Sequence, residues 1–381
     1  MAFVSVSDFE QKASVELEKN ALDYYKSGAG EQLTLRLNRE AFQRVVRLRF
    51  NLGFWLLGLL RLRPRCLRDV SQLEISCMIL GHHIEFPLGI APVAMQKMAH
   101  PVGEIGNARA AGVAGCIFIL STLATTSLED LAAAAPETCK WFQLYIYKDR
   151  ALTESLVRRA ENAGFKALVL TVDAPVFGQR RDDVRNKFSL PSHLSLANFH
   201  GELASGVVSV IGGSGLSEYV VSQFDPTVTW QDIKWLKLLT HLPIIVKGVL
   251  TAEDAELARE FGCAGIIVSN HGGRQLDSTP ATIEVLPEIV KAVGKDLVVM
   301  LDGGIREGND ILKALALGAQ MVFIGRPSIW ALACDGLRGV EQLLGLLRKD
   351  FEISMALTGC RTLADIQATM VVPESAYRRL K

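Results

Sequence analysis

Short apolar runs alternate along this chain with longer segments in which apolar residues recur at helical spacing. Runs of this length, rich in Val, Ile and Leu, are typical of strands that are buried on both faces of a parallel sheet. They predict eight strands, at residues 87–90, 116–120, 141–145, 167–172, 243–247, 265–268, 297–302 and 321–324. Helices are predicted between them, for example over 151–163, 252–261, 280–293 and 309–317. This alternation predicts an α/β fold, a closed (β/α)8 barrel.

The ends of the predicted helices and the chain length agree with this architecture. Three of the helices are followed at once by a glycine, Gly164, Gly262 or Gly318, and helices that end in the left-handed conformation favour glycine there. Single barrels with insertions routinely reach the 381 residues of this chain. We therefore expect one domain over residues 1–381.

One connection is much longer than the others. Residues 178–230 separate the fourth and fifth predicted strands with a polar segment rich in Gly and Ser. Loops of this length in compact domains are usually functional covers or disordered. The segment follows Asp173 at the end of the fourth strand and carries Arg180 and Arg181 near its start. These charges favour a mobile lid over the barrel mouth, with an inert surface insertion as the alternative.

Composition and charge limit the classes of function. The 41 basic and 41 acidic residues cancel without forming blocks of like charge, which argues against nucleic-acid binding and favours a small-molecule ligand. Seven scattered cysteines without a CxxC pair indicate neither a disulfide framework nor a metal site. The first residues show no secretory signal, and the longest apolar run, residues 50–60, is too short for a transmembrane helix. We expect a soluble protein with reduced thiols.

Candidate chemistry follows the sixth predicted strand. It leads into Ser269-Asn270-His271-Gly272-Gly273-Arg274-Gln275-Leu276-Asp277. This segment places a titratable base and a fixed cation at the mouth of a strand, where barrel enzymes carry their active sites. Ordinary turn glycines, a structural histidine and a salt bridge between Arg274 and Asp277 are the alternatives that the residues alone leave open.

Two glycine-containing loops indicate a phosphate site. The seventh strand leads into Asp302-Gly303-Gly304-Ile305-Arg306, and the eighth into Gly325-Arg326-Pro327. Barrels commonly bind phosphate with the loops after these two strands, where backbone N–H groups and a helix N-terminus attract an anion. Several barrel families share this pattern, and simple turn glycines are the alternative.

The nonapeptide 269–277 as a whole resembles the signature of the FMN-dependent 2-hydroxy acid oxidase and dehydrogenase family, which includes glycolate oxidase, long-chain hydroxy acid oxidase and flavocytochrome lactate dehydrogenase. The resemblance runs from about residue 3 to residue 361 and includes the segment 95–101, the pair Tyr24-Tyr25 and the strand end Gln143-Leu144-Tyr145. It implies a TIM barrel that binds FMN. A flavin supplies the electron sink that hydroxy acid oxidation needs and that side chains lack.

The resemblance also implies roles for the matching residues. His271 would be the catalytic base, and Asp173 would orient its ring and stabilise the imidazolium. Two tyrosines and two arginines would bind the substrate hydroxyl and carboxylate: Tyr24, Tyr145, Arg180 and Arg274. The residues alone would favour core positions for the tyrosines and a solvated loop position for Arg180, and the choice of Arg180 over Arg181 comes from the family.

The residues that would bind FMN stand at strand ends and in the two glycine loops. They are Pro92, Val93, Ala94, Ser121, Gln143, Thr171, Lys247, Ser269, Asp302, Gly304, Arg306, Gly325 and Arg326. Lys247 ends the fifth strand and would place a positive charge beside the reduced flavin. A buried lysine without such a partner would be costly. No metal ion is implied.

One departure from the family bears on the substrate. Ser121-Thr122-Leu123-Ala124 carries Leu123 where glycolate oxidases place a tryptophan. A leucine leaves more apolar room in the substrate site than an indole. We therefore expect medium-chain, long-chain or aromatic 2-hydroxy acids as substrates.

Two further departures concern assembly and compartment. Residues 50–60 form an apolar insertion that could bury at a subunit interface, rest on a membrane or disturb folding. The last residues, Arg379-Leu380-Lys381, do not match the Ser-Lys-Leu-like signal of peroxisomal relatives. The resemblance implies a homotetramer in the peroxisome, active in fatty acid metabolism, and without an import signal the cytoplasm is the alternative.

These features predict an (S)-2-hydroxy acid oxidase that forms 2-oxo acids and reduces oxygen to hydrogen peroxide through FMN. Two alternatives stay open at this point. One is an FMN-dependent dehydrogenase that uses another electron acceptor, and the other is a non-catalytic barrel that binds FMN or a phosphorylated ligand.

Overall fold

The computed structural model describes residues 3–43, 48–49, 55–56, 60–208 and 213–373. Eight parallel strands close into a barrel in the order β10-β11-β12-β13-β6-β7-β8-β9. Their bounds are β6 (Leu88–Ile90), β7 (Ile117–Leu120), β8 (Cys139–Leu144), β9 (Leu168–Thr171), β10 (Ile244–Val249), β11 (Gly265–Val268), β12 (Val298–Asp302) and β13 (Met321–Ile324). All eight predicted strands are confirmed, with ends that differ by up to two residues.

The barrel is filled by side chains from alternate strand positions. Ile117 and Ile119 point inward to one apolar cluster with Trp141 and Phe323, whereas Phe118 packs outward against the helices. A hairpin of β4 (Cys77–Ile79) and β5 (His82–Ile84) adds Ile79 and Ile84 to the inner cluster. Because these isoleucines share the cluster with the first residues of the strands, the hairpin closes the amino end of the barrel, and the carboxyl end remains for the site.

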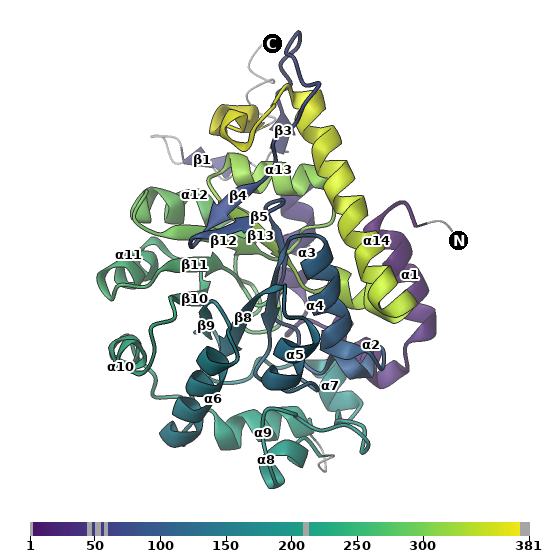
Figure 1. The fold of residues 1–381 in the computed structure, drawn as a ribbon, viewed down its shortest axis with the longest axis vertical. Helices are drawn as coiled ribbons and strands as arrows, with labels where there is room; N and C mark the ends of the chain where they lie inside the picture. Colours follow the sequence, from purple (N-terminus) through teal and green to yellow (C-terminus); the bar gives the residue numbers. More distant parts are fainter. Residues whose placement is uncertain (1–2, 44–47, 50–54, 57–59, 209–212, 374–381) are drawn as a thin grey trace.

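Helices surround the barrel (Figure 1). They are α4 (Gly103–Val113), α5 (Leu128–Ala134), α6 (Arg150–Asn162), α10 (Gln231–Leu239), α11 (Ala252–Glu260), α12 (Thr282–Val293), α13 (Gly308–Ala316) and α14 (Arg326–Thr358). The four helices that the sequence predicts are confirmed as α6, α11, α12 and α13. Gly164, Gly262 and Gly318 follow three of them with positive φ, as expected for glycine at a helix end.

Three helices precede the barrel: α1 (Val6–Glu16), α2 (Lys19–Lys26) and α3 (Leu33–Gln43). Helix α1 packs along α14, so the first and the last α-helix lie side by side (Figure 1). Helix α2 carries Tyr24 and Tyr25 to the carboxyl end of the barrel. Short 3-10 helices are η1 (Gln96–Met98), η2 (Leu363–Asp365) and η3 (Ala368–Met370), and β3 (Leu60–Leu62) pairs with β14 (Val371–Pro373).

The long connection between β9 and β10 differs from the polar loop that its composition predicts. It contains the helices α7 (Arg181–Arg185), α8 (Glu202–Ser205) and α9 (Gly215–Gln223), which gather at the bottom of Figure 1. Phe188, Leu196 and Tyr219 from this segment are buried in the main apolar cluster. Its apolar residues are spaced too irregularly among Gly and Ser to predict these helices. The connection is therefore packed against the rest of the protein through these side chains, and its role as a mobile lid stays a prediction.

Most of the apolar insertion 50–60 lies outside the described residues. Of its surroundings, the structure gives the antiparallel pairing of β1 (Leu48–Arg49) with β2 (Trp55–Leu56). The last three residues, 379–381, also lie outside the described part. Among the helices of the described residues, none has the length and apolar character needed to cross a membrane.

Candidate active site

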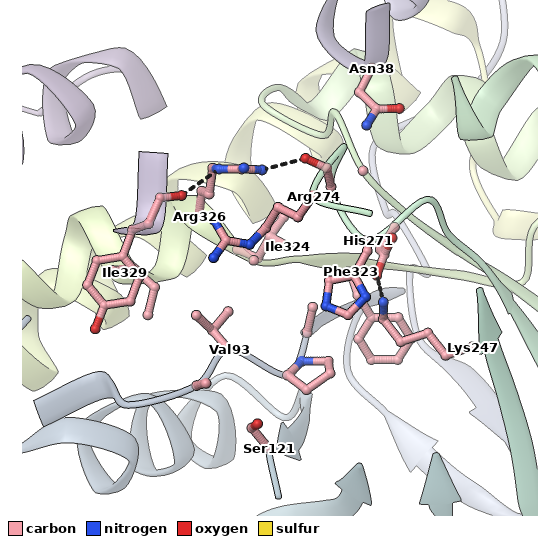
Figure 2. A pocket seen from close by; sticks show the side chains of 18 of the residues that line it. Asn38, Val93, Ser121, Lys247, His271, Arg274, Phe323, Ile324, Arg326 and Ile329 are labelled. Atoms are coloured by element: carbon pink, nitrogen blue, oxygen red, sulfur yellow. Dashed lines mark hydrogen bonds and ion pairs between the residues drawn. The ribbon is translucent and has the colours of Figure 1, made fainter. Parts of the chain in front are cut away.

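A pocket of about 130 Å³ lies at the carboxyl end of the barrel strands. All of the predicted site residues line it except Asp173 and Ser269, and each of these two hydrogen-bonds a residue that does. Figure 2 shows His271, Arg274 and Lys247 on one side of this pocket and Val93 and Ser121 on another. Barrel closure thus brings together residues from nearly the whole length of the chain.

His271 is held by the residues around it in a backbone conformation that is rare outside glycine, with φ of 57°. Its Nδ1 lies 2.9 Å from Asp173 Oδ1, and its backbone N–H donates to Ser269 Oγ at 3.1 Å. Burial lowers the pKa of the imidazole, while Asp173 opposes that effect. Burial alone would raise the pKa of Asp173, but the neighbouring His271 and Lys247 hold it below its usual value. Near neutral pH, both directions favour a neutral His271 beside an ionised Asp173.

Arg274 reaches back to the first helices. Its Nη1 donates to the main-chain oxygens of Tyr24 and Ser27, and its guanidinium lies 4.8 Å from the centre of the Tyr24 ring. Asp277 does not pair with it and instead accepts backbone N–H groups at the start of α3, including that of Thr34 at 2.9 Å. The alternative interpretation of Arg274, a salt bridge with Asp277, is therefore wrong.

Arg180 is buried, with 3% of its side chain exposed. Its guanidinium lies 3.8 Å from the centre of the Phe177 ring, and Nη1 is 3.9 Å from Asp183 Oδ2. Burial and the nearby Arg274 lower the pKa of Arg180 to about 10. Arg181 points away and forms an ion pair with the exposed Glu31. Two cations, the buried Arg180 and the half-buried Arg274, thus line one pocket and could bind a carboxylate there.

Tyr145 and Leu123 complete this end of the pocket. The Tyr145 ring stacks on Phe224, with 4.3 Å between ring centres, and burial raises the pKa of its phenol. Leu123 is 4% exposed. Its carbonyl oxygen accepts the Met95 N–H at 3.1 Å, and this hydrogen bond holds its backbone in place. An apolar wall therefore lies beside the polar groups.

Lys247 has protein partners at the base of the pocket. Its Nζ lies 3.2 Å from Asp302 Oδ2 and donates to Ser269 Oγ at 2.8 Å. The sequence argument sought the partner of this buried lysine in the flavin alone, whereas the structure pairs it with Asp302. Asp302 Oδ1 is buried without a hydrogen-bond partner among the described residues. Of the three donors on the Lys247 ammonium, one therefore remains for another group.

The two glycine loops form a cradle for an anion. Gly304 has φ of 93°, and a Cβ there would lie 1.9 Å from the Asn38 carbonyl oxygen, so only glycine fits. Burial and the nearby Arg39 lower the pKa of Arg306 to about 10, and its buried Nε has no partner in the described part of the chain. Arg326, at the start of α14, donates to the carbonyl oxygens of Tyr25, Ser27 and Gly272. Two half-buried arginines, one of them at a helix start, suit a phosphate group.

The structure adds residues to the site that the sequence did not predict. Asn38 and Asn270 exchange side-chain hydrogen bonds of 2.7 and 2.8 Å. Gln275 donates to the carbonyl oxygens of Asp173 and Val176 and accepts the N–H of Gly178. The two amides of the nonapeptide were visible in the sequence, but nothing near Asn38 indicates its partner. The pocket is also lined by Tyr25, Leu35, Arg39, Phe177, Leu216 and Phe323.

Comparisons with known proteins agree with this geometry. Residues 13–373 match the family described as FMN-dependent dehydrogenase. Glycolate oxidase 3 of Arabidopsis thaliana is 51% identical over 371 residues, covering 97% of this chain and 96% of the relative. Glycolate oxidase of Spinacia oleracea is 49% identical over 374 residues, covering 98% and 97%.

Solved structures give the same result. A mandelate oxidase with (S)-4-hydroxymandelic acid is 40% identical, with a TM-score of 0.88 over 97% of this chain and 98% of that one. The predicted family, fold and cofactor are confirmed. The chain belongs to the FMN-dependent dehydrogenase family and is an FMN-dependent 2-hydroxy acid oxidase of the glycolate oxidase type.

Proposed function

We propose that this oxidase acts on (S)-2-hydroxy acids whose side chains are longer than that of glycolate, aliphatic or aromatic. The observation that carries the proposal is the apolar wall of Leu123, Leu216 and Phe177 in the pocket that also holds Arg180 and His271. An apolar side chain gains free energy from leaving water at such a wall. The mandelate oxidase structure, which holds an aromatic hydroxy acid, supports this class.

We assign the proton transfer to His271. Asp173 occupies Nδ1, which leaves Nε2 as the ring nitrogen that can take a proton from the substrate. The lowered pKa of His271 keeps the imidazole neutral and ready to accept. Once it is protonated, the adjacent carboxylate of Asp173 stabilises the imidazolium. FMN, when bound, supplies the two-electron acceptor and passes the electrons to oxygen.

Two arginines of the pocket would bind the substrate. Arg180 and Arg274 would hold its carboxylate, because each still has N–H donors left by its protein partners. Tyr24 and Tyr145 line the same part of the pocket and would hydrogen-bond the substrate oxygens. The carboxylate contacts fix the acid in place and so set the reacting hydroxyl near His271.

The cofactor contacts remain a proposal for each residue. Lys247 and the two arginines Arg306 and Arg326 would supply positive charge. The other predicted FMN contacts are the carboxylate of Asp302 and a set of uncharged residues. The uncharged residues are Pro92, Val93, Ala94, Ser121, Gln143, Thr171, Ser269, Gly304 and Gly325. Loss of bound flavin from an Arg306→Met variant would support this set, and full retention would contradict the role of Arg306.

Substrate length is tested with a series of (S)-2-hydroxy acids from glycolate to medium-chain, long-chain and aromatic members. We expect kcat/KM to rise beyond glycolate. Leu123→Trp should narrow the pocket and restore preference for short acids. Leu276→Trp is the matched control, because Leu276 is 73% exposed. An absolute preference for glycolate in the parent enzyme would refute the proposal.

We also propose the assembly and compartment that the family resemblance implies: a homotetramer located in peroxisomes and acting in fatty acid metabolism. Hydrogen peroxide as a product supports that compartment. Light scattering after size-exclusion chromatography measures the assembly, and cell fractionation measures the compartment. A monomer, or protein found wholly in the cytosol, would contradict the respective part.

A further inference from the structure

A second cavity, here called the side crevice, lies behind the active-site pocket. It has a volume of about 240 Å³ and is formed by the ends of β9 and β10 together with residues 224–230 and α10. Tyr145 and Thr171 line both the side crevice and the active-site pocket. The two spaces therefore share a wall.

The side crevice runs from the surface to that wall. Pro226 and Thr229 at its outer end are exposed, whereas Ile146, Leu170 and Val249 at its inner end are buried. The inner end is lined mainly by apolar side chains, with Thr171 as a polar one. Asp225, which also lines the crevice, is paired with Arg150 at 2.6 Å. An apolar space of this kind attracts small apolar molecules in preference to water.

The shared wall selects by size. The Tyr145 ring is stacked on Phe224, and the Asp225 N–H donates to the carbonyl oxygen of Ile146, just after β8, at 3.1 Å. A substrate with a carboxylate would have to displace this stacked pair. A diatomic molecule needs a much smaller opening between these two rings.

We propose that the side crevice is the route by which dioxygen reaches the active site. It would stay open while a 2-hydroxy acid or its 2-oxo product fills the front of the pocket. In each turnover one oxygen molecule takes the two electrons and two protons removed from the substrate and leaves as hydrogen peroxide. The inference rests on oxygen as the electron acceptor and does not depend on the proposed substrate length.

The test fills the crevice at Val228, which lines it and is half-buried. Val228→Leu, Val228→Phe and Val228→Trp form a series of increasing bulk, so the milder members remain informative if the largest does not fold. Val221→Trp is the matched control, because Val221 lies on the same connection in α9, is 60% exposed and is not part of the crevice.

Three measurements decide the proposal. Xenon, as the oxygen probe, should bind in the crevice of the parent and of Val221→Trp and be displaced progressively in the Val228 series. The rate at which oxygen restores the flavin absorbance should fall several-fold along the same series, while anaerobic bleaching by substrate stays unchanged. An unchanged reoxidation rate after xenon is displaced would overturn the proposal. So would slower bleaching or a raised KM for long acids with normal reoxidation, since these results would assign the crevice to the substrate.

Discussion

Two pairs of a basic side chain and a carboxylate lie at the carboxyl end of this barrel, one partly buried and one buried, and they differ in what they can do. In one, His271 and Asp173 are 2.9 Å apart with 21% and 11% of their side chains exposed. In the other, Lys247 and Asp302 are 3.2 Å apart with 5% and 8% exposed. The first pair contains an imidazole, which can gain and lose a proton near neutral pH, and the second contains a lysine ammonium held against a carboxylate.

The difference indicates that the two pairs at the barrel mouth have different roles. Burial keeps His271 neutral beside an ionised Asp173, so this pair can gain a proton and return it. Lys247 has Ser269 and Asp302 as partners on the floor of the pocket, so this pair provides a charge in a constant position. We infer that the first pair serves proton transfer and the second serves structure and cofactor binding.

The largest effect is expected from His271→Gln. Removing the base should slow anaerobic flavin bleaching by substrate by about 10³-fold, within the range usual for general acid–base catalysis. His241→Gln is the control, because His241 is exposed. Flavin should stay bound in both variants. A bleaching rate close to that of the parent would show that His271 does not transfer the proton. It would also contradict the role assigned to the pair of His271 and Asp173.

Lys247→Met should act on stability. Taking one partner from a buried ion pair leaves an uncompensated charge on Asp302 and should lower the free energy of unfolding by about 3–5 kcal/mol. Denaturant unfolding measures it, with the exposed Lys291→Met as the control. The double variant Lys247→Met/Asp302→Leu should regain much of the loss. Equal stability of Lys247→Met and the parent would show that the pair has no structural role.

Asp173→Asn should have a smaller effect on the bleaching rate, a loss of roughly 10²-fold. The amide no longer stabilises the imidazolium, although it can still contact the ring. Because the carboxylate raises the pKa of His271, its loss should also move the acid limb of the rate profile to lower pH. An unmoved acid limb would show that Asp173 is not coupled to the base.

The smallest effect concerns the parent enzyme and pH. His271 accepts a proton only when neutral, so kcat/KM should fall as pH drops through its pKa. Burial, with contributions from Lys247 and Arg180, holds that pKa below the ordinary value of 6.5, and the acid limb should lie below it too. A steady-state profile measured with one substrate tests this. An acid limb above 6.5 would mean that Asp173 outweighs burial.

The sequence by itself determined the barrel and most of its site. Eight apolar runs with turn residues at their ends predict eight strands because burial on both faces requires apolar side chains at every position. The phosphate loops and the nonapeptide 269–277 were readable for the same reason, since their glycines and charged residues are local features. The choice of Arg180 over Arg181 needed the family resemblance, and the structure then showed Arg180 in the pocket and Arg181 on the surface.

Tertiary structure alone decided the partnerships. His271 bonds Asp173 across 98 positions, and Asn270 bonds Asn38 across 232. The pairing of Lys247 with Asp302 and the packing of α7, α8 and α9 were likewise decided by the tertiary structure. Local patterns determine which face of an element a side chain occupies. Which side chains meet depends on strand order and on closure of the barrel, and these involve the whole chain at once.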